Sequence, residues 1–362
     1  MKLLLITDAW FPQTNGVVTT LSCVIDRLPS LGVTPSVIHP GLFSSFGLPG
    51  YREIPLVIDL WRLPAMIREI DPDSVHIATE GPLGIAARRY MVKRRLPFTT
   101  SLHTKFPEYF HERVRTPLAL GYRFIRWFHR PSARTLCTTV SHRDELERWG
   151  LGDLVVWSRG VDTEQFMPCR DHPLHERPRL LYVGRVSVEK NIQAFLDLDI
   201  DADKIIVGDG PARTELEKRF PEVIWLGFRK GMELVREYAR ADVFVFPSLT
   251  DTFGLVMLEA NACGTPVAAY PVTGPKDVVE QGRNGALHQD LGTAIHQALR
   301  VPRASCRAVA LENGWDVIAE RFVAAQAPVR PGACQDIASA RSDLDNGAAW
   351  PLKIQPRSMT GS

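Results

Sequence analysis

Residues 243–269 read VFVFPSLTDTFGLVMLEANACGTPVAA and contain, in order, the signals for a strand, a loop, a helix and a second strand. The runs 243–246 and 266–269 are apolar and of strand length, whereas 254–263 is long enough for a helix. Apolar strands joined by helices are typical of a parallel sheet that is covered on both faces. This segment therefore predicts an α/β fold in which strands and helices alternate.

The same alternation continues outward from this segment in two series, which a polar, proline-containing stretch at 163–178 separates. Two doubly wound sheets in one chain leave a cleft between them, and ligands of such folds bind there. We expect a first domain over 1–165, a second over 175–303, a helix over 304–327 that packs back toward the first domain, and a loose tail over 328–362.

The strand signals are short apolar runs, and the proline- and glycine-rich stretch from about 40 to 55 is expected to be a loop. The expected strands are 2–7, 35–39, 74–78, 98–103 and 136–140 in the first domain, and 179–183, 204–207, 223–226, 243–246 and 266–269 in the second.

The 362 residues have ordinary globular composition, with 45% hydrophobic residues, 23% charged residues and a formal net charge of +2. This composition excludes a disordered, collagen-like or coiled-coil chain. No apolar run approaches the ~20 residues of a membrane-spanning helix, and the opening MKLLLITDAW reaches Asp8 too early for a signal peptide. The six cysteines are scattered without C-x-x-C or metal-ligand spacing, so we expect reduced thiols in a cytoplasmic protein.

Three loops that follow strands of the second series concentrate the chemistry. Gly184 and Arg185 end one strand and Lys190 opens the next helix, so a glycine, two cations and helix N–H groups could surround a phosphate. In VGDGP (207–211), two glycines after a strand permit close approach of backbone. Asp251 and Glu259 could accept hydroxyl hydrogen bonds from the two ends of an elongated, sugar-containing ligand. Taken one at a time, these loops are equally typical of tight turns with solvated side chains.

The three loops together resemble, in sequence and in order, the retaining glycosyltransferases of family 4. The segments that carry the resemblance are VGRVSVEKN (183–191), VGDGP (207–211) and TDTFGLVMLEANACGTPVAAYPVTGP (250–275), with weaker matches in SRGVDTEQF (158–166), FPQTNGV (11–17) and TSLHTKFPEY (100–109). The resemblance covers roughly residues 1–325 and implies the GT-B fold, in which two Rossmann-like, doubly wound domains face each other across a cleft. TEGPLG (79–84), HPGLF (39–43) and TDTFG favour the narrower group of GDP-mannose-dependent α-mannosyltransferases and glycolipid (diacylglycerol) glycosyltransferases.

In such enzymes the second domain holds a nucleotide sugar, and the resemblance implies a role for each matching residue. Arg185 and Lys190 would hold the diphosphate, Asp251 and the N–H groups of 253–255 the transferred sugar, and Glu259 the ribose hydroxyls. Catalysis is thus assigned to His103, Arg185, Lys190 and Asp251, and donor binding to Gly16, Gly184, Gly208, Gly210, Phe253, Gly254, Leu255 and Glu259.

The implied reaction moves a mannose or glucose-type unit to a glycolipid or diacylglycerol with retention of configuration. The donor would be GDP-mannose, UDP-glucose or UDP-glucuronate, with no resident cofactor and no metal. Asp201 and Asp203 have the spacing of an Asp-x-Asp metal motif, but their acidic surroundings favour a solvated turn. The chain departs from the family at Asp251, where Glu is frequent, and at Val17 and Thr104.

The acceptor is expected on the first domain, where residues 81–134 carry 12 basic and 2 acidic residues, a net of +10, together with several aromatics. Such a surface suits a protein that rests on an anionic membrane and admits a lipid head group, so we expect peripheral association with the inner face of the cytoplasmic membrane. The alternative interpretation of residues 81–134 is that the aromatic side chains belong to the core and the arginines are simply exposed to solvent. No nucleic-acid-binding motif occurs.

Three alternatives remain open at this point. The acceptor could be a soluble molecule, a polysaccharide or a lipopolysaccharide. A sugar-nucleotide epimerase would use a similar cleft but release an isomerised sugar. A non-catalytic nucleotide-sugar-binding protein of the same fold would bind the donor without turnover.

Overall fold

The computed structural model describes residues 1–13, 15–48, 51–103, 107–108, 115–170, 175–249, 251 and 253–329, with the backbone alone at 46–48 and 51–56. All but the first two residues of the expected tail at 328–362 lie outside the described residues.

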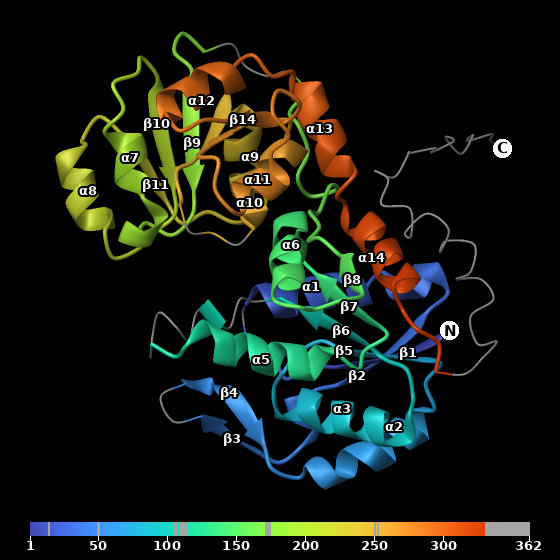
Figure 1. Ribbon diagram of the computed structural model, residues 1–362. Coiled ribbons are helices and arrows are strands. Elements are labelled where there is room, and N and C mark those ends of the chain that lie inside the picture. The colour runs from blue at the N-terminus through green and yellow to red at the C-terminus, as the bar shows by residue number, and fades with distance from the viewer. Residues whose placement is uncertain are drawn as a thin grey trace, which may run out of the picture.

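Two six-stranded sheets form the centres of two domains, the C-terminal one above the N-terminal one in Figure 1. The strand orders are β2-β1-β5-β6-β7-β8 and β11-β10-β9-β12-β13-β14, and all neighbours run parallel. The order reverses beside β1 in one sheet and beside β9 in the other, and ligands of such sheets bind outside the carboxyl ends of the strands at that point. The predicted pair of doubly wound domains is confirmed.

The strands of the N-terminal sheet are β1 (Lys2–Ile6), β2 (Thr34–Ile38), β5 (Ser74–Ile77), β6 (Thr99–Leu102), β7 (Arg134–Cys137) and β8 (Leu154–Val156). Those of the C-terminal sheet are β9 (Arg179–Val183), β10 (Asp203–Val207), β11 (Ile224–Gly227), β12 (Val243–Phe246), β13 (Val267–Ala269) and β14 (Gly285–Leu287).

The helices of the N-terminal half are α1 (Gly16–Ile25), α2 (Leu63–Ile70), α3 (Pro82–Arg94), α5 (Leu118–His129) and α6 (Val140–Arg148). The later helices are α7 (Ile192–Leu196), α8 (Arg213–Arg219), α9 (Gly231–Arg240), α10 (Leu255–Ala262), α11 (Pro275–Val278), α12 (Leu291–Ala298), α13 (Arg303–Leu311) and α14 (Trp315–Ala324).

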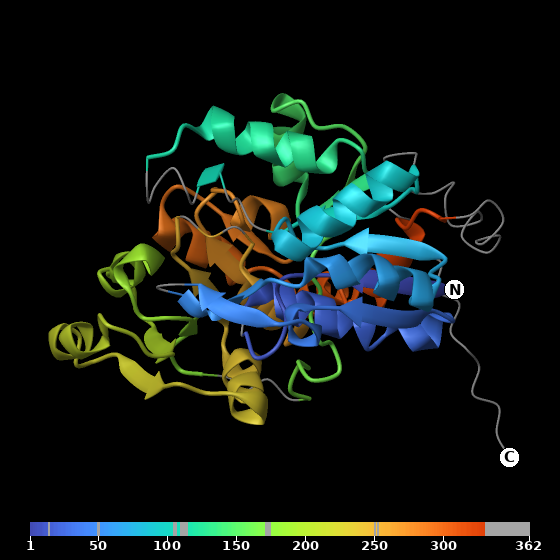
Figure 2. The same cartoon turned by 90° about the horizontal axis from the view of Figure 1, so that it is seen from below.

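Helices cover both faces of the N-terminal sheet because successive residues of a strand point to opposite sides. Leu3 and Leu5 of β1 pack with α1 and α14, whereas Leu4 and Ile6 pack with α2, α3 and α5. In the view from below, the cyan and teal helices α3 and α5 lie together on one side of the blue strands (Figure 2). Each of these fully buried aliphatic side chains contributes about 1.5–3 kcal/mol to folding.

The C-terminal sheet is built in the same way. Leu181 and Phe244 pack with α9 and α10, and Leu180 and Val243 pack with α7, α8 and α12 on the opposite face. Both faces are apolar, which explains why the strands appear in the sequence as continuous apolar runs.

The structure differs from the sequence expectations in three respects. The edge strands β8 and β14 are not among the expected strands, because each has only three residues and is too short to stand out as an apolar run. The stretch expected to be a loop contains an antiparallel hairpin, β3 (Ser45–Leu48) and β4 (Tyr51–Val57). The single helix expected over 304–327 is two helices, α13 and α14, because Gly314 is extended and begins a new helix at the end of a short turn. Helix α13 packs on α10 of the C-terminal domain, and α14 packs on α1 of the N-terminal domain.

Within the described residues, no helix has both the length and the apolar character that a membrane crossing requires.

Candidate active site

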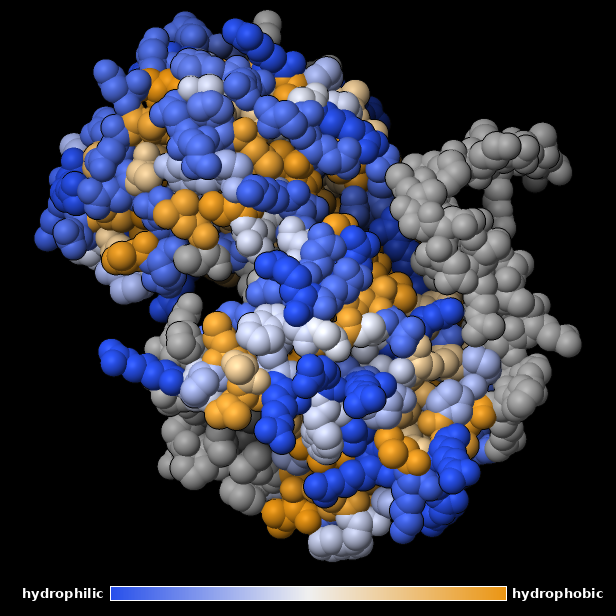
Figure 3. Space-filling view, in the orientation of Figure 1, coloured by the Kyte–Doolittle hydropathy of each residue, from blue (hydrophilic) through white to orange (hydrophobic). Residues whose placement is uncertain are grey.

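Two cavities lie at the carboxyl ends of the two sheets, where the space-filling surface is hollowed at the junction of the domains (Figure 3). The C-terminal cavity has a volume of about 270 Å³ and is lined by the ends of β9 and β12 and the start of α10. The N-terminal cavity has a volume of about 780 Å³ and is lined by the ends of β1, β5 and β6 and by one face of α5. Arg159 lines both.

Arg185, Lys190 and Asp251 come together in the C-terminal cavity. The Lys190 ammonium donates to Oδ2 of Asp251 at 2.6 Å, and both side chains are partly buried. The loop that carries Lys190 is held against the end of β12, because the side-chain amide of Asn191 donates to the carbonyl of Pro247 at 3.1 Å. The site therefore offers one cation paired with a carboxylate and a second, Arg185, that makes no ion pair with a described residue.

Gly208 and Gly210 are placed where the loop after β10 crosses the loop after β9. A Cβ atom on Gly208 would lie 1.9 Å from the carbonyl oxygen of Gly184, and one on Gly210 would lie 2.3 Å from that of Val186. Val186 also donates its N–H to the carbonyl of Asp209 at 3.0 Å. These contacts give the two glycines a packing function toward the chain itself, whatever ligand the loops hold.

The start of α10 faces the same cavity through Phe253, Gly254 and Leu255. Gly254 has a left-handed backbone (φ 82°), which glycine adopts without strain. The first N–H groups of the helix have no partner within the helix and carry partial positive charge. They can therefore donate to an electronegative ligand that enters the cavity.

Glu259 lies one turn further along α10 and does not line the C-terminal cavity. Its Oε2 accepts a hydrogen bond from the hydroxyl of Tyr238 on α9 at 2.8 Å. Burial raises the pKa of the Glu259 carboxyl. One carboxylate oxygen is thus fixed by Tyr238, which leaves the other available to a ligand.

His103 and Gly16 line the N-terminal cavity, so the structure places the predicted residues of this domain on the side opposite Arg185. His103 follows β6 and is only 8% exposed, packed edge-on against Trp157. Burial, with the Arg159 charge as a second cause, lowers the pKa of His103 to about 3. The imidazole is therefore neutral and acts through hydrogen bonds rather than through charge.

A buried chain of hydrogen bonds, which the sequence analysis missed, sets the tautomer of His103. The Thr99 hydroxyl donates to Oε1 of Gln326 at 2.7 Å, so Nδ1 of His76 is the donor in its 2.9 Å bond to Thr99. Burial lowers the pKa of His76 to about 3, which leaves Nε2 of this neutral ring as an acceptor for Ser101 at 3.1 Å. Ser101 then accepts from Nε2 of His103 at 2.8 Å, and Nδ1 of His103 is an acceptor.

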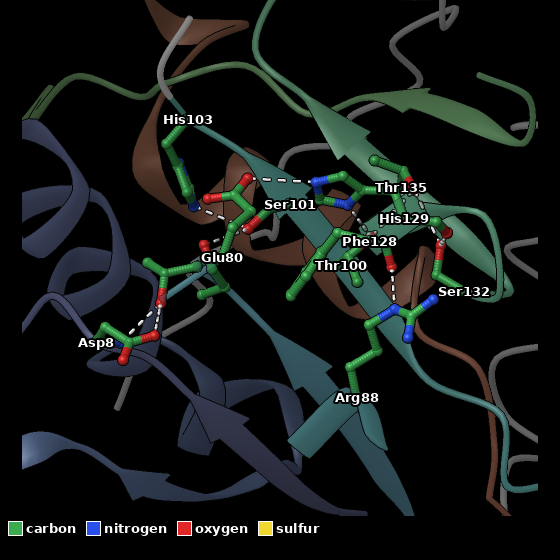
Figure 4. Close-up of polar contacts among 12 residues, drawn as sticks. Asp8, Glu80, Arg88, Thr100, Ser101, His103, Phe128, His129, Ser132 and Thr135 are labelled. Atoms are coloured by element: carbon green, nitrogen blue, oxygen red, sulfur yellow. Dashed lines mark hydrogen bonds and ion pairs between the residues drawn. The ribbon is translucent and has the colours of Figure 1, made fainter. Parts of the chain in front are cut away.

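Two acids on the floor of the N-terminal cavity are also bound to the fold (Figure 4). Asp8 accepts from the backbone N–H groups of Leu83 and Gly84 at 2.8 and 3.2 Å, and so caps helix α3. Burial raises the pKa of Asp8. Glu80 meets Nε2 of His129 at 3.2 Å, and both side chains are buried. These carboxylates position β1, β5, α3 and α5 around the cavity.

Arg159 is a further residue of the site to which the sequence analysis assigns no role. A Cβ atom on Gly16 would lie 2.4 Å from its Nη1, so the guanidinium rests on the first residue of α1. Its Nε atom is buried without a hydrogen-bond partner, and burial lowers the pKa of the group. Arg159 lies in the segment 158–166, which the sequence analysis gave as a weaker match to family 4 glycosyltransferases. Nothing in that segment indicates that Arg159 contacts Gly16.

The acidic turn considered as a metal motif is bound to an arginine. Asp201 pairs with Arg177 at 2.8 Å and Asp203 lies 3.8 Å from the same side chain. The described residues hold no group of three or more His, Cys, Asp or Glu side chains placed for a metal ion.

Residues 14–165 match the family described as Glycosyltransferase Family 4, and residues 177–301 match that described as Glycosyl transferases group 1. A GDP-mannose-dependent alpha-mannosyltransferase of Mycolicibacterium smegmatis is 30% identical over 90% of this chain and 93% of its own length. An alpha-monoglucosyldiacylglycerol synthase of Streptococcus pneumoniae is 25% identical over 89% of this chain and 83% of its own.

Among solved structures, Anabaena HepE in complex with UDP has a TM-score of 0.67 at 17% identity, over 89% of this chain and 98% of its own. The lipopolysaccharide outer core galactosyltransferase WaaB has a TM-score of 0.67 at 17% identity, over 90% of this chain and 99% of its own. These likenesses confirm the predicted fold, so the two facing domains define the GT-B class. The chain belongs to glycosyltransferase family 4, the group 1 glycosyltransferases, a family of retaining hexosyltransferases.

Proposed function

We propose that the protein transfers a mannose or glucose-type unit from a nucleotide sugar to a glycolipid or diacylglycerol at an anionic membrane surface. The observation that carries the proposal is the N-terminal cavity. It opens opposite the cation-lined C-terminal cavity, and α5 gives it an apolar wall through Leu120, Phe124 and Ile125. A wall of this kind suits the apolar part of a lipid acceptor better than a free sugar. Relatives named as mannosyltransferase and glucosyldiacylglycerol synthase support the same substrate class.

The donor would enter the C-terminal cavity. Arg185 and Lys190 would hold its diphosphate, and Asp251 with the N–H groups at the start of α10 would hold the sugar. Glu259, with one oxygen already held by Tyr238, would accept from a ribose hydroxyl. Breaking the sugar–phosphate bond leaves negative charge on the nucleoside diphosphate, and fixed cations with helix N–H groups stabilise that charge as it develops.

Retention would follow from attack on the face that the diphosphate leaves. The acceptor hydroxyl then approaches from the N-terminal cavity, and the departing phosphate oxygen takes its proton. His103, neutral and with Nδ1 as an acceptor, would orient a hydroxyl of the reacting sugar and would not compete for the proton as a charged group.

A basic, aromatic surface on α5 and the adjoining part of α3 would hold the protein on the membrane. Arg123 and Arg126 are exposed on α5, Arg130 is exposed directly after its last residue, and all three line one hollow of about 460 Å³. Trp127 is 43% exposed beside them, and the Arg88 guanidinium lies 4.0 Å from the centre of its ring. On an anionic leaflet each such arginine contributes about 1 kcal/mol. We place the protein in the cytoplasm, peripheral on the inner face of the membrane.

The test of the reaction is release of nucleoside diphosphate from GDP-mannose, UDP-glucose and UDP-glucuronate, each with and without a diacylglycerol-containing lipid extract. Release from one donor only when lipid is present is the expected result. Lipid-independent release with a glycosylated soluble product would replace the lipid acceptor by a soluble glycan. Conversion of the donor to an isomeric nucleotide sugar would show epimerisation instead of transfer. Absence of nucleoside diphosphate release with every donor would refute the proposal.

The membrane component is tested separately by co-sedimentation with anionic liposomes at low salt. The double variant Arg123→Gln/Arg130→Gln should weaken binding by about 2 kcal/mol, or roughly 30-fold. The control Arg68→Gln/Arg148→Gln removes the same charge from exposed sites on α2 and α6. Equal loss in the two variants, or no binding by the parent protein, would remove α5 as the membrane-binding surface.

A further inference from the structure

Arg159 combines three properties that rarely occur together in a side chain without a ligand. It lines both cavities, its side chain is partly buried with Nε fully buried, and neither a hydrogen bond nor an ion pair joins its guanidinium to a described residue. A buried charge without a partner is costly, and folded proteins keep such groups where a binding partner arrives later. The position of Arg159 therefore indicates an anion at the junction of the two cavities.

The two acids that line the N-terminal cavity do not serve as that anion. Asp8 accepts from the backbone at the start of α3, and Glu80 is paired with His129. Lys190 is likewise paired with Asp251 on the opposite side. Among the described residues that line the two cavities, Arg159 and Arg185 are left as the cations without an acidic partner.

The backbone around Arg159 is anchored to residues 313–318. Trp157 donates from Nε1 to the carbonyl of Ile318 at 3.1 Å, Gly160 lies directly against the ring of Trp315, and Val161 donates its N–H to the carbonyl of Asn313 at 3.0 Å. The backbone on both sides of Arg159 is thus fixed by the segment around α14. An arginine on a fixed stretch of backbone loses less freedom when it binds than one on a mobile loop, which favours affinity.

The two unpaired cations match the charge of a diphosphate. A nucleoside diphosphate carries roughly −2 to −3 at neutral pH, because its terminal phosphate ionises with a pKa near 6. Lys190 and Asp251 together contribute no net charge, so Arg185 alone would leave most of this charge uncompensated. Arg159 supplies the second positive charge, from the N-terminal domain, and its planar guanidinium is suited to paired phosphate oxygens.

We propose that Arg159 is a phosphate-binding residue of the donor site, which meets the diphosphate from the N-terminal domain while Arg185 and Lys190 meet it from the C-terminal domain. The proposal rests on the proposed function for the nature of the ligand, a nucleoside diphosphate. The proposal also explains why a glycine occupies position 16, since any side chain there would displace the Arg159 guanidinium.

The experiment is calorimetric titration of the full chain with GDP, UDP and the nucleosides guanosine and uridine, with no acceptor present. Arg159→Gln should weaken binding of the preferred diphosphate roughly 10- to 100-fold and leave nucleoside binding unchanged, and Arg159→Lys should recover part of the loss. Arg68→Gln removes the same charge from an exposed position on α2 and should bind like the parent protein.

Urea unfolding of the ligand-free proteins separates binding from a structural role. Removal of a buried, unpaired cation should leave Arg159→Gln at least as stable as the parent, whereas a structural arginine would lower stability. Unchanged diphosphate affinity in Arg159→Gln, or equal loss in Arg68→Gln, overturns the proposal. If neither diphosphate binds the parent protein, this proposal and the proposed donor fail together. If the binding result holds but no lipid-dependent release occurs, only the proposed function fails.

Discussion

Replacing Gly208 by alanine tests whether close packing against the loop after β9 holds the loop after β10 in its conformation. The new Cβ would lie 1.9 Å from the carbonyl oxygen of Gly184 and 2.9 Å from its carbonyl carbon. These are backbone atoms at the end of a central strand, so the clash is relieved only by moving one loop away from the other. Gly208 also has a φ of 141°, which a side chain disfavours.

The size of the effect follows from three contributions. Overpacking costs about 1–3 kcal/mol and the backbone conformation a further ~1–3 kcal/mol, while the lower entropy of the unfolded chain returns about 0.4–1 kcal/mol. We expect Gly208→Ala to lower the free energy of unfolding by about 2–4 kcal/mol. Because Arg185 lies on the displaced loop, affinity for a nucleoside diphosphate should fall as well.

The assay is urea unfolding followed by tryptophan fluorescence, with two matched glycine controls. Gly32 has a φ of 71° and nothing within 4 Å of its Cβ position, so Gly32→Ala measures the backbone contribution alone. Gly152 has neither feature, and Gly152→Ala should be neutral or slightly stabilising. If Gly208→Ala were no less stable than Gly32→Ala, the contact with Gly184 would have no energetic weight and the packing argument would be wrong.

Three further predictions concern the site. Lys190→Ala breaks the 2.6 Å pair with Asp251 and should lower transfer at least 100-fold, measured as nucleoside diphosphate release; near-parental turnover would exclude Lys190 from the mechanism. Tyr238→Phe leaves Glu259 without its 2.8 Å donor and should cost about 1–3 kcal/mol of stability in urea, whereas an unchanged midpoint would contradict it. The pKa of His76 and of His103 is about 3 in the folded protein against 6.5 in the unfolded chain. The unfolded state therefore binds more protons below pH 6.5, and the free energy of unfolding should fall with decreasing pH by up to about 1.4 kcal/mol per unit for each histidine. Urea titrations from pH 7 to 5 measure the slope, which His76→Gln should reduce and His296→Gln, on an exposed control position, should not; a flat profile would refute the burial argument.

Ten of the twelve strands in the two sheets are readable from the sequence, because burial on both faces makes each one a continuous apolar run, as in 243–246. The edge strands β8 and β14 have three residues each, which is too short for such a run. The hairpin at 45–57 is not readable either, because its glycines and prolines are typical of loops and its pairing depends on contacts that no local pattern records. The break between α13 and α14 was missed for a related reason. Apolar periodicity continues through Gly314, and only the contacts with two different domains separate the helices.

The residues of the candidate site likewise fall into those that the sequence predicts and those that only the fold reveals. Arg185, Lys190, Asp251 and Glu259 lie in motifs whose order along the chain is informative, so the sequence suffices to nominate them. The hydrogen-bond chain behind His103 joins Ser101 to Gln326, and Arg159 meets Gly16 from a different part of the chain. Such groups are brought together by the fold alone, and residue type at one position gives no sign of the partner.

Within the part of the chain that the structure describes, the backbone passes between the domains twice, once after β8 and once between α13 and α14, and hydrogen bonds join the two passages. Val161 on the first and Gly314 on the second form a parallel bridge, and Arg307 of α13 donates to the carbonyls of Thr163 and Phe166 at 2.8 and 2.7 Å. The two connecting segments therefore act as one hydrogen-bonded unit rather than as two independent linkers. Because the two connecting segments are bonded side by side, we expect any opening of the cleft to be a hinge rotation about the line of Val161 and Gly314. Arg159, two residues from that axis, would then travel little while the far rims of the cavities separate.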